Sequence, residues 1–409
     1  MKKLFITFLF LLMGGLALAQ APHLFEHTYP IVAEENAVIR NLMDQVSVDS
    51  LKATIEHLSS YHTRRYDSQM VYDVQDWLYN RYAELHFDSI YLHDFQFIHN
   101  DIPVETSDNV IVIQKGTKIP DEYVVCGAHY DSFNNDGADP DTIFAPGADD
   151  NATGVAGILE TARILRQCSF DRSIIYCAWA AEEVGLKGSA AYAQDCAEKM
   201  VDIVGYFNLD MTGYLEAGSD MLVHLLYTEQ DSVFADYVFS FSHTYFPGMH
   251  ISHNWLMNGA DSDFSSFNRN GYPAVHPSEN VHHLSPYIHS RQDMLGVSVN
   301  NMDQVKRFTE LNLGTVATLA GWNGWTGIEE NLQSHVTVYP NPTRQKVNIC
   351  SMDEIHTIRI YNVLGQIMEE IITNGQCSYV LDLSRYHSGL YLINVTTAHN
   401  NMTQQLVVQ

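Results

Sequence analysis

The chain has 409 residues, which is too long for one typical domain and long enough to bury a large core. Its 49 acidic and 22 basic residues give a formal net charge of −27 at pH 7. This charge argues against nucleic acid and anionic lipid as partners, because proteins bind both through positive charge.

The N-terminus has the pattern of a secretory signal peptide in residues 1–19. Two lysines precede an apolar run from Leu4 to Leu18, and an A-x-A cleavage site ends at Ala19. The apolar run is short for a membrane span, and no later stretch is long and apolar enough to cross a bilayer. We therefore expect a secreted mature protein without a membrane span. The sequence leaves open whether the following segment, residues 20–46, is a propeptide.

Helix and strand patterns alternate between residues 47 and 326. Helical periodicity over about 46–87 is followed by short β-branched runs and amphipathic stretches. Strands are expected at 109–114, 122–128, 172–180 and 203–210, and helices at 153–167, 188–200 and 302–322. This alternation favours an α/β domain with a mixed, mostly parallel sheet sandwiched by helices. Residues 258–293 lack periodicity and are rich in Gly, Asn, Ser, Pro and His, so we expect long functional loops there.

The pattern changes near the C-terminus. From residue 336 to residue 409, short runs of alternating hydrophobic and polar residues are separated by turns. This pattern predicts a small all-β sandwich as a second domain, with residues 327–335 as the linker.

The chain contains six cysteines. Cys126 and Cys177 lie in apolar strand-like runs, where a buried free thiol is the usual outcome. Two further pairs, Cys168 with Cys196 and Cys350 with Cys377, are left open as disulfides, because connectivity cannot be read from sequence.

Five potential metal ligands follow one another near the ends of predicted strands or in loops. They are His129, Asp149, Glu183, Asp210 and His289. Two histidines and three carboxylates suit a pair of divalent ions that share one bridging carboxylate. Function gathers at the carboxyl ends of strands in such sheets, which supports this selection.

The bridging carboxylate is expected in the turn PGADDNATG. Asp149 is placed there to bridge two ions, and the alternative for one of the two acids is to cap the helix that follows. His289 has three competitors in the same loops, namely His276, His282 and His283.

Two further acids are expected to act beside the ligands. Glu182 precedes the ligand Glu183, and we predict that it serves as the general base. A solvated acidic turn is the alternative, but the apolar residues YCAWA that lead into the pair argue against it. Asp131 follows His129 by two residues, a spacing that allows it to accept a hydrogen bond from the free ring nitrogen and fix the tautomer.

Residues 47–325 resemble the secreted bacterial aminopeptidases of the co-catalytic di-zinc exopeptidase family, which have a phosphorylase/hydrolase-like α/β fold. The resemblance rests on AHYDS, PGADDNATG, EEVGLKGS, NLDMTG, SDFSSF and PYIHSRQD. It implies peptide substrates with a free N-terminus and two Zn²⁺ ions. The implied ligands are His129, Asp149 and Asp210 on one ion and Asp149, Glu183 and His289 on the other, with Glu182 as the base and Asp131 behind the first histidine. The family often has His where this chain has Phe264, a difference that concerns loop contacts near the substrate and not the metal ligands.

The C-terminal region resembles the sorting domain of the type IX secretion system. The motifs are VYPNPT, IYNVLGQ, LDLSRYHSGLYLINV and a final QQLVVQ, where the family usually has Lys in place of Gln405. The resemblance implies the type IX machinery as a partner, passage through the periplasm and a secreted or cell-surface location. The alternative is an appended sandwich that binds carbohydrate or protein.

Two rival functions share the first fold. One is an acyltransferase of the glutaminyl cyclase type, which uses one zinc and resembles this chain at AHYDS and at the Glu pair. That group departs at the bridging turn, where Ser replaces the second acid. The other is a non-catalytic receptor-like domain, which loses ligands that this chain retains.

Overall fold

The computed structural model describes residues 21–136, 141–255, 262–325, 336–339, 341–343, 345–351, 354–362, 365–397 and 401–408. The predicted signal peptide (1–19) and linker (327–335) lie outside these ranges. The chain divides into two compact units, Met1–Thr326 and Gly327–Gln409. Among the described residues, no helix combines the length and the apolar character that crossing a membrane requires.

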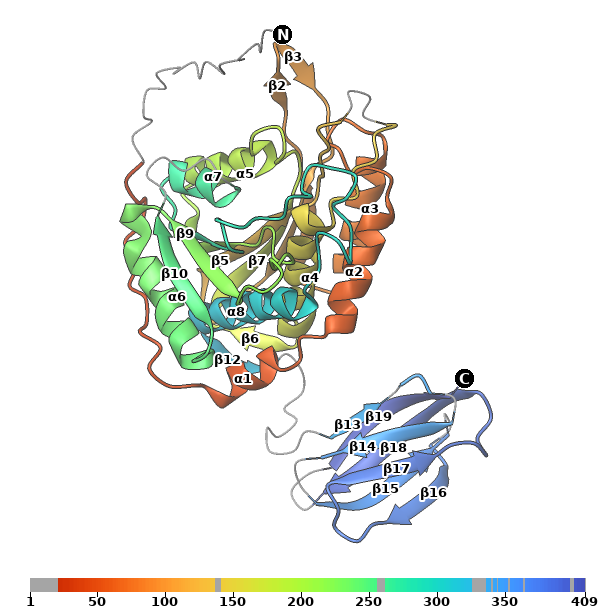
Figure 1. Ribbon diagram of the computed structural model, residues 1–409. Coiled ribbons are helices and arrows are strands. Elements are labelled where there is room, and N and C mark those ends of the chain that lie inside the picture. The colour runs from red at the N-terminus through yellow and green to blue at the C-terminus, as the bar shows by residue number, and fades with distance from the viewer. Residues whose placement is uncertain are drawn as a thin grey trace. The chain divides into compact units, whose positions relative to one another are not determined.

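The first unit is built on an eight-stranded mixed sheet (Figure 1). In spatial order the strands are β1 (Ser89–His93), β4 (Asn109–Gln114), β7 (Arg172–Trp179), β5 (Ile119–His129), β8 (Asp202–Asn208), β11 (Ala274–Ser278), β9 (Leu222–Tyr227) and β10 (His250–Trp255). The four central strands, β7, β5, β8 and β11, are parallel, whereas β4 and β9 pair with this block antiparallel. The predicted mixed, mostly parallel sheet is confirmed.

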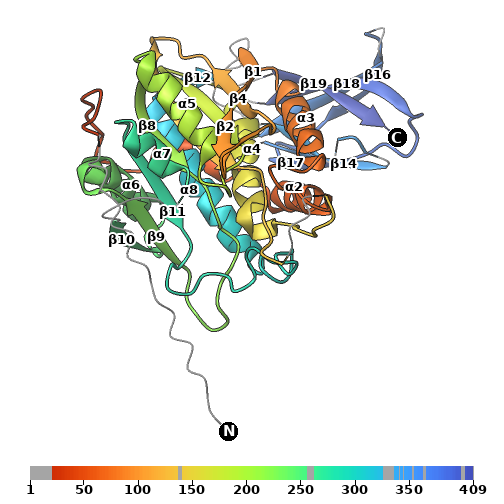
Figure 2. The ribbon, with the colours of Figure 1, turned by 90° about the horizontal axis from the view of Figure 1, so that it is seen from above.

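Helices cover both faces of this sheet, as Figure 2 shows from a second direction. One face is covered by α1 (Ala37–Met43), α2 (Val48–Ser60), α3 (Met70–Ala83), α4 (Gly154–Leu165), α6 (Ser232–Tyr245) and α8 (Met302–Ala320), and the other by α5 (Lys187–Glu198) and α7 (Phe264–Arg269). Val124 and Cys126 of β5 pack in the first core, while Val125 between them packs in the second. This alternation is that of a strand buried on both faces.

Two expectations for this unit need correction. The helical stretch over 46–87 is two helices, α2 and α3, separated by residues 61–69. The expected loops at 258–293 include the short helix α7 and the central strand β11. Strand β11 has only five residues, too few to show a period, and it is held by backbone pairing with β8 on one side and β9 on the other.

The N-terminal segment packs along the first unit. The backbone N–H of Leu24 donates to the carbonyl of Gly271 at 2.9 Å, and the Tyr29 hydroxyl donates to the carbonyl of Val204 at 2.8 Å. Helix α1 then buries Leu42 and Met43 completely. Residues 21–46 therefore contact the body of the first unit at several points.

Four cysteines of the first unit, Cys126, Cys168, Cys177 and Cys196, are buried free thiols. The disulfide left open between Cys168 and Cys196 is therefore not formed.

The second unit consists of two antiparallel sheets around one core. Its strands are β13 (Thr337–Tyr339), β14 (Lys346–Cys350) and β17 (Ser378–Asp382) in one sheet, and β16 (Ile367–Ile372), β15 (Ile355–Tyr361), β18 (Gly389–Thr397) and β19 (Asn401–Val408) in the other. Ile349 of the first sheet and Ile358 of the second are fully buried in this core. The predicted small all-β region is confirmed.

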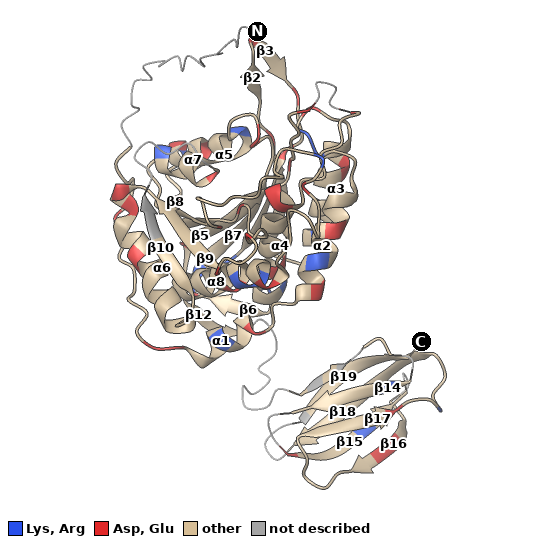
Figure 3. Ribbon diagram, in the orientation of Figure 1, with Lys and Arg blue, Asp and Glu red and all other residues tan. Residues whose placement is uncertain are grey.

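The acidic excess of the chain is distributed over several elements. Figure 3 shows acidic positions on the outer helices α3 and α6 of the first unit. The negative charge is therefore not confined to the edge of the sheet where the candidate ligands gather.

Candidate metal centre

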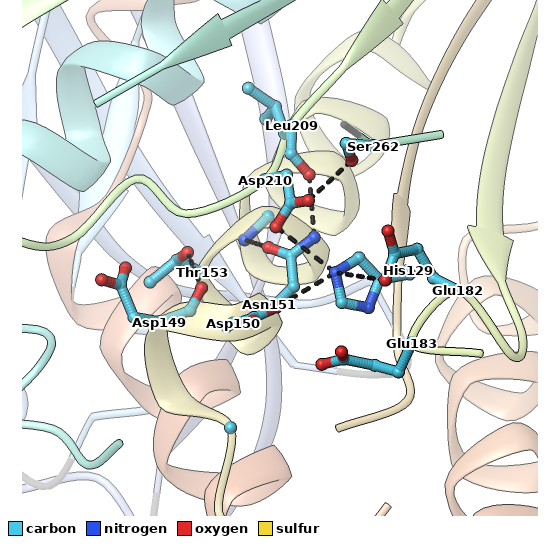
Figure 4. Close-up of polar contacts among 12 residues, drawn as sticks. His129, Asp149, Asp150, Asn151, Thr153, Glu182, Glu183, Leu209, Asp210 and Ser262 are labelled. Atoms are coloured by element: carbon cyan, nitrogen blue, oxygen red, sulfur yellow. Dashed lines mark hydrogen bonds and ion pairs between the residues drawn. The ribbon is translucent and has the colours of Figure 1, made fainter. Parts of the chain in front are cut away.

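Three parallel strands bring the predicted ligands to one edge of the sheet. His129 is the last residue of β5, Glu182 and Glu183 follow the end of β7, and Asp210 follows the end of β8. Strand β5 lies between the other two in the sheet. Because parallel strands end at the same edge, these side chains meet there, as Figure 4 shows.

Two groups of side chains share one carboxylate at this edge. His129 Nε2 lies 3.2 Å from Asp150 Oδ1 and 3.3 Å from Asp210 Oδ1. His289 Nε2 lies 3.0 Å from Asp150 Oδ2 and 3.0 Å from Glu183 Oε2. Asp150 therefore directs one oxygen toward each histidine.

Asp149, the residue expected to bridge, does not lie between the histidines. Its fully buried carboxylate accepts hydrogen bonds from the backbone N–H of Gly213 at 2.8 Å and from the hydroxyl of Ser298 at 3.5 Å. Figure 4 shows this side chain turned away from the cluster. Consecutive side chains in the irregular turn η1 (Ala148–Thr153) point in different directions, so the expectation is corrected by one residue to Asp150.

Asp131 lies behind His129 and the Glu pair. Its buried Oδ1 lies 3.5 Å from His129 Nδ1, which is the side of the ring that faces away from Asp150. The same carboxylate accepts the backbone N–H groups of Glu182 at 3.0 Å and Glu183 at 3.2 Å. One buried acid thus contacts the histidine and holds the turn that carries both glutamates.

Glu182 stands beside His129, with Oε2 4.0 Å from Nε2. Burial raises the pKa of the Glu182 carboxyl well above its usual range, and the neighbouring Glu183 adds to this shift. Burial also raises the pKa of Glu183 to about 8. Hydrogen bonds to Asp150 and Glu183 raise the pKa of His289 to about 11. Ionisation of the two glutamates is thus disfavoured by burial and by their proximity, and a bound cation would stabilise their charged forms.

The side chains present fit zinc. Imidazole nitrogens and carboxylate oxygens are ligands that Zn²⁺ accepts. His129, Asp150 and Glu183 offer ligand atoms that all lie within 4.8 Å of one another, and so do His129, Glu182 and Asp210. Glu183 Oε1 is buried without a hydrogen-bond partner in the described part of the chain, a cost that a metal ion at this position would remove.

Two side chains that hold the ligands were missed in the sequence. Ser262 donates its hydroxyl to Asp210 Oδ2 at 2.6 Å. Asp293 accepts the backbone N–H groups of Asp149 at 2.9 Å and Asp150 at 3.1 Å. Asp293 follows His289 by four residues, and this proximity to a predicted ligand was the only signal for it in the sequence.

The competitors of His289 have other neighbours: His282 packs against His224 with ring centroids 5.2 Å apart, and His283 Nδ1 lies 2.9 Å from Glu216 Oε2. His276 Nε2 lies 3.1 Å from the backbone oxygen of Asp210, so it contacts the main chain behind that ligand. Phe264, which stands where the resembled family often has His, is fully buried and packs against His276 with ring centroids 5.7 Å apart. The His-to-Phe difference therefore belongs to the core behind the site.

Residues 109–314, half of the chain, match the model of Peptidase family M28. The chain belongs to peptidase family M28. It is a zinc metallopeptidase whose relatives include aminopeptidases.

Several known proteins are similar to this M28 peptidase over most of its length. A probable aminopeptidase of Saccharomyces cerevisiae is 25% identical over 315 residues, which cover 75% of this chain and 82% of the yeast protein. Leucine aminopeptidase 1 of Trichophyton equinum is 29% identical over 313 residues, covering 71% of this chain and 79% of that protein.

Solved structures share the fold. The LapA aminopeptidase of Legionella pneumophila superimposes with a TM-score of 0.62 at 23% identity, over 73% of this chain and 78% of LapA. A leucine aminopeptidase precursor from Bacteroides thetaiotaomicron gives a TM-score of 0.54 at 17% identity, over 67% of this chain and 97% of that structure.

The second unit of this M28 peptidase has its own match. Residues 337–409 match the model of the Secretion system C-terminal sorting domain. A domain of this kind implies that the protein is secreted or displayed at the cell surface.

Proposed function

We propose that this M28 peptidase is an aminopeptidase that removes the N-terminal residue of peptides at a site with two zinc ions. The observation that carries the proposal is the position of Asp150, which directs one carboxylate oxygen toward His129 and the other toward His289. His129, Asp150 and Asp210 would hold one ion, and Asp150, Glu183 and His289 the other. The aminopeptidase names of the relatives support the choice of reaction.

Glu182 is the general base in this proposal. A zinc pair, when bound, lowers the pKa of water and polarises the scissile carbonyl. Glu182 accepts the proton of the attacking water and returns it to the leaving amine. Its position next to His129 supports this role, because a base must lie within reach of water bound at the site.

Asp131 has a supporting part. Its two oxygens accept the backbone N–H groups of Glu182 and Glu183, so the base and a ligand are held by one carboxylate. Preorganised groups of this kind keep the base and the ligand in place during reaction.

The geometry favours this reaction over the cyclase alternative. A glutaminyl cyclase of this type uses one zinc ion. In this chain one oxygen of Asp150 faces His129, and the other faces a second group made of His289 and Glu183. A second set of ligands has no evident purpose in a one-zinc enzyme.

We propose that two segments direct export: the signal peptide of residues 1–19 and the C-terminal sorting domain. Residues 1–19 would direct the protein to the periplasm as a cleaved signal peptide. The sorting domain would then pass it to the type IX machinery, which would carry it across the outer membrane.

Metal content and substrate cleavage test the proposal together. The purified mature protein should contain about two zinc ions per chain and release amino acids from Leu-, Met- or Ala-p-nitroanilide, with cleavage lost on chelation. A content of one zinc per chain, no cleavage, and cyclisation of a peptide with N-terminal Gln would replace the proposal with the cyclase.

A further inference from the structure

The two acidic pairs at the site, Glu182-Glu183 and Asp149-Asp150, are each bound through their backbone N–H groups by one buried aspartate. Each oxygen of the buried Asp131 accepts one backbone N–H of the pair Glu182-Glu183, at 3.0 and 3.2 Å. Each oxygen of the buried Asp293 accepts one backbone N–H of the pair Asp149-Asp150, at 2.9 and 3.1 Å. Neither Asp131 nor Asp293 has more than 1% of its surface exposed, so water is a poor substitute for these contacts.

Asp293 makes one more contact to the same turn. Its backbone carbonyl accepts the N–H of Ala148 at 3.0 Å. Three consecutive N–H groups, those of residues 148, 149 and 150, therefore donate to this single residue. The position of Asp150 is thus set by Asp293 through the main chain.

The loop of Asp293 also carries a ligand. His289 lies four residues earlier and contacts the far oxygen of Asp150 at 3.0 Å. The carbonyl of His289 accepts the N–H of Asn135, which lies in the loop that follows His129. Asp293 therefore ties the loop of one histidine to the carboxylate that both histidines share.

The buried Arg64 binds the backbone next to Asp131 and also the backbone of the turn that Asp293 holds. Arg64 is fully buried and donates to the carbonyl of Tyr130 at 2.8 Å and to that of Gly147 at 2.8 Å. The first carbonyl belongs to the peptide unit before Asp131, and the second lies two residues before Asp149. The acceptors in these bonds are neutral carbonyls, so the charge of Arg64 is left to offset the buried carboxylates around it.

From this arrangement we infer that Asp293 is a positioning residue for the bridging ligand, the counterpart of Asp131 at the Glu pair. Asp293 touches no reacting group. It acts through the backbone of Asp150 and through the loop it shares with His289, and so it sets the affinity of both ions. The inference rests on the proposed two-zinc function.

Asp293→Asn tests this role with little change of shape. An amide has one oxygen to accept with, so one of the two N–H groups faces the NH₂ of Asn and loses its acceptor. We expect zinc affinity at both sites, measured by competition with a chelator, to fall about 10- to 100-fold. Activity lost at limiting zinc should return when zinc is saturating, and the KM at saturation should change little.

Two matched variants make the result specific. Asp131→Asn should lower kcat even at saturating zinc, because Asp131 holds the base Glu182 in addition to the ligand Glu183. Asp236→Asn, an exposed acid on α6, should leave zinc affinity and activity as they are. An Asp293→Asn protein that binds zinc as tightly as the parent would overturn the inference.

Circular dichroism of the zinc-free proteins serves as the control for folding. If zinc-free Asp293→Asn does not fold, Asp293→Ser carries the same expectation, since the smaller side chain leaves room for water at the N–H groups. Failure of both variants to fold would assign Asp293 to the fold and overturn its role at the metals. A parent protein without zinc would contradict the proposed function instead, so the two failures are distinguishable.

Discussion

The two acidic pairs of the site, Glu182-Glu183 and Asp149-Asp150, look alike in sequence and differ in space. Each pair has the same type of support, a buried aspartate that accepts both backbone N–H groups. In the Glu pair both carboxylates approach a histidine. In the Asp pair only the second does, and the first is bound by Gly213 and Ser298 in the interior.

The difference teaches that the path of the backbone and the local hydrogen-bond donors decide which acid of a pair is functional. Glu182 and Glu183 follow the end of β7, and their carboxylates approach different histidines. Asp149 points away from the histidines, and the N–H of Gly213 donates to its carboxylate at 2.8 Å. The Asp pair therefore yields one ligand and one structural acid, whereas the Glu pair yields one ligand and one base.

The largest expected effect is at Glu182. Replacing it with Gln should lower kcat by about 10²- to 10⁴-fold, because the amide cannot take up the proton of the attacking water. Zinc content should stay at the parent level, since Glu182 is not a proposed ligand. Turnover of Leu-p-nitroanilide together with metal analysis checks both parts, and substantial residual turnover would remove Glu182 from the role of base.

Glu183→Gln should distinguish the role of Glu183 as a ligand from the role of Glu182 as the base. It removes a proposed ligand of the ion near His289, so affinity for that ion should fall by more than about 100-fold, which exceeds the usual effect of changing a supporting group. The ion near His129 should remain. Zinc titration that still shows two tight sites would contradict the assignment of Glu183 as a ligand.

Gly213→Ala probes the structural member of the Asp pair. A Cβ at this position would lie 3.0 Å from Asp149 Oδ1 and 2.8 Å from Val299 Cγ1. We expect the free energy of unfolding in denaturant to fall by about 1–3 kcal/mol because of this overpacking. Gly248→Ala is the control, since its Cβ would meet nothing within 4 Å. Equal stability of the two variants would mean that the space around Asp149 is looser than described.

Removing the second unit should have the smallest effect on chemistry. The residues of the site all lie in Met1–Thr326, which forms a compact unit by itself. A chain ending at Thr326 should keep kcat/KM within about twofold of the parent, as expected for a domain with its own core. Export should stop, and secretion of the shortened chain would contradict the sorting role of the tail.

Much of the fold was predictable because its strands are long and apolar. Strand β4 occupies the predicted 109–114, and β7, β8 and α8 begin or end within two residues of expectation. Strand β11 was not predictable, because its five residues take their structure from pairing with β8 and β9. Local pattern cannot report a strand that is specified by its neighbours.

The candidate site was predictable to the level of the motif but not always of the residue. Strand ends pointed to His129, Glu183 and Asp210, which the structure brings together. At the turn PGADDNATG the two acids are adjacent, and which of them faces the histidines depends on the path of the backbone. Asp293 and Arg64 act through main-chain groups, so the sequence does not reveal their roles, although Asp293 lies four residues after the predicted ligand His289.

Zinc content of Asp150→Asn and Asp149→Asn, measured side by side, tests the central claim most directly. Asn at position 149 can still accept from Gly213 and donate to the hydroxyl of Ser298, so this variant should fold and hold two zinc ions like the parent. Asn at position 150 removes the shared carboxylate and should release zinc from both sites. Loss of zinc in Asp149→Asn with retention in Asp150→Asn would contradict the assignment of Asp150 as the bridging ligand.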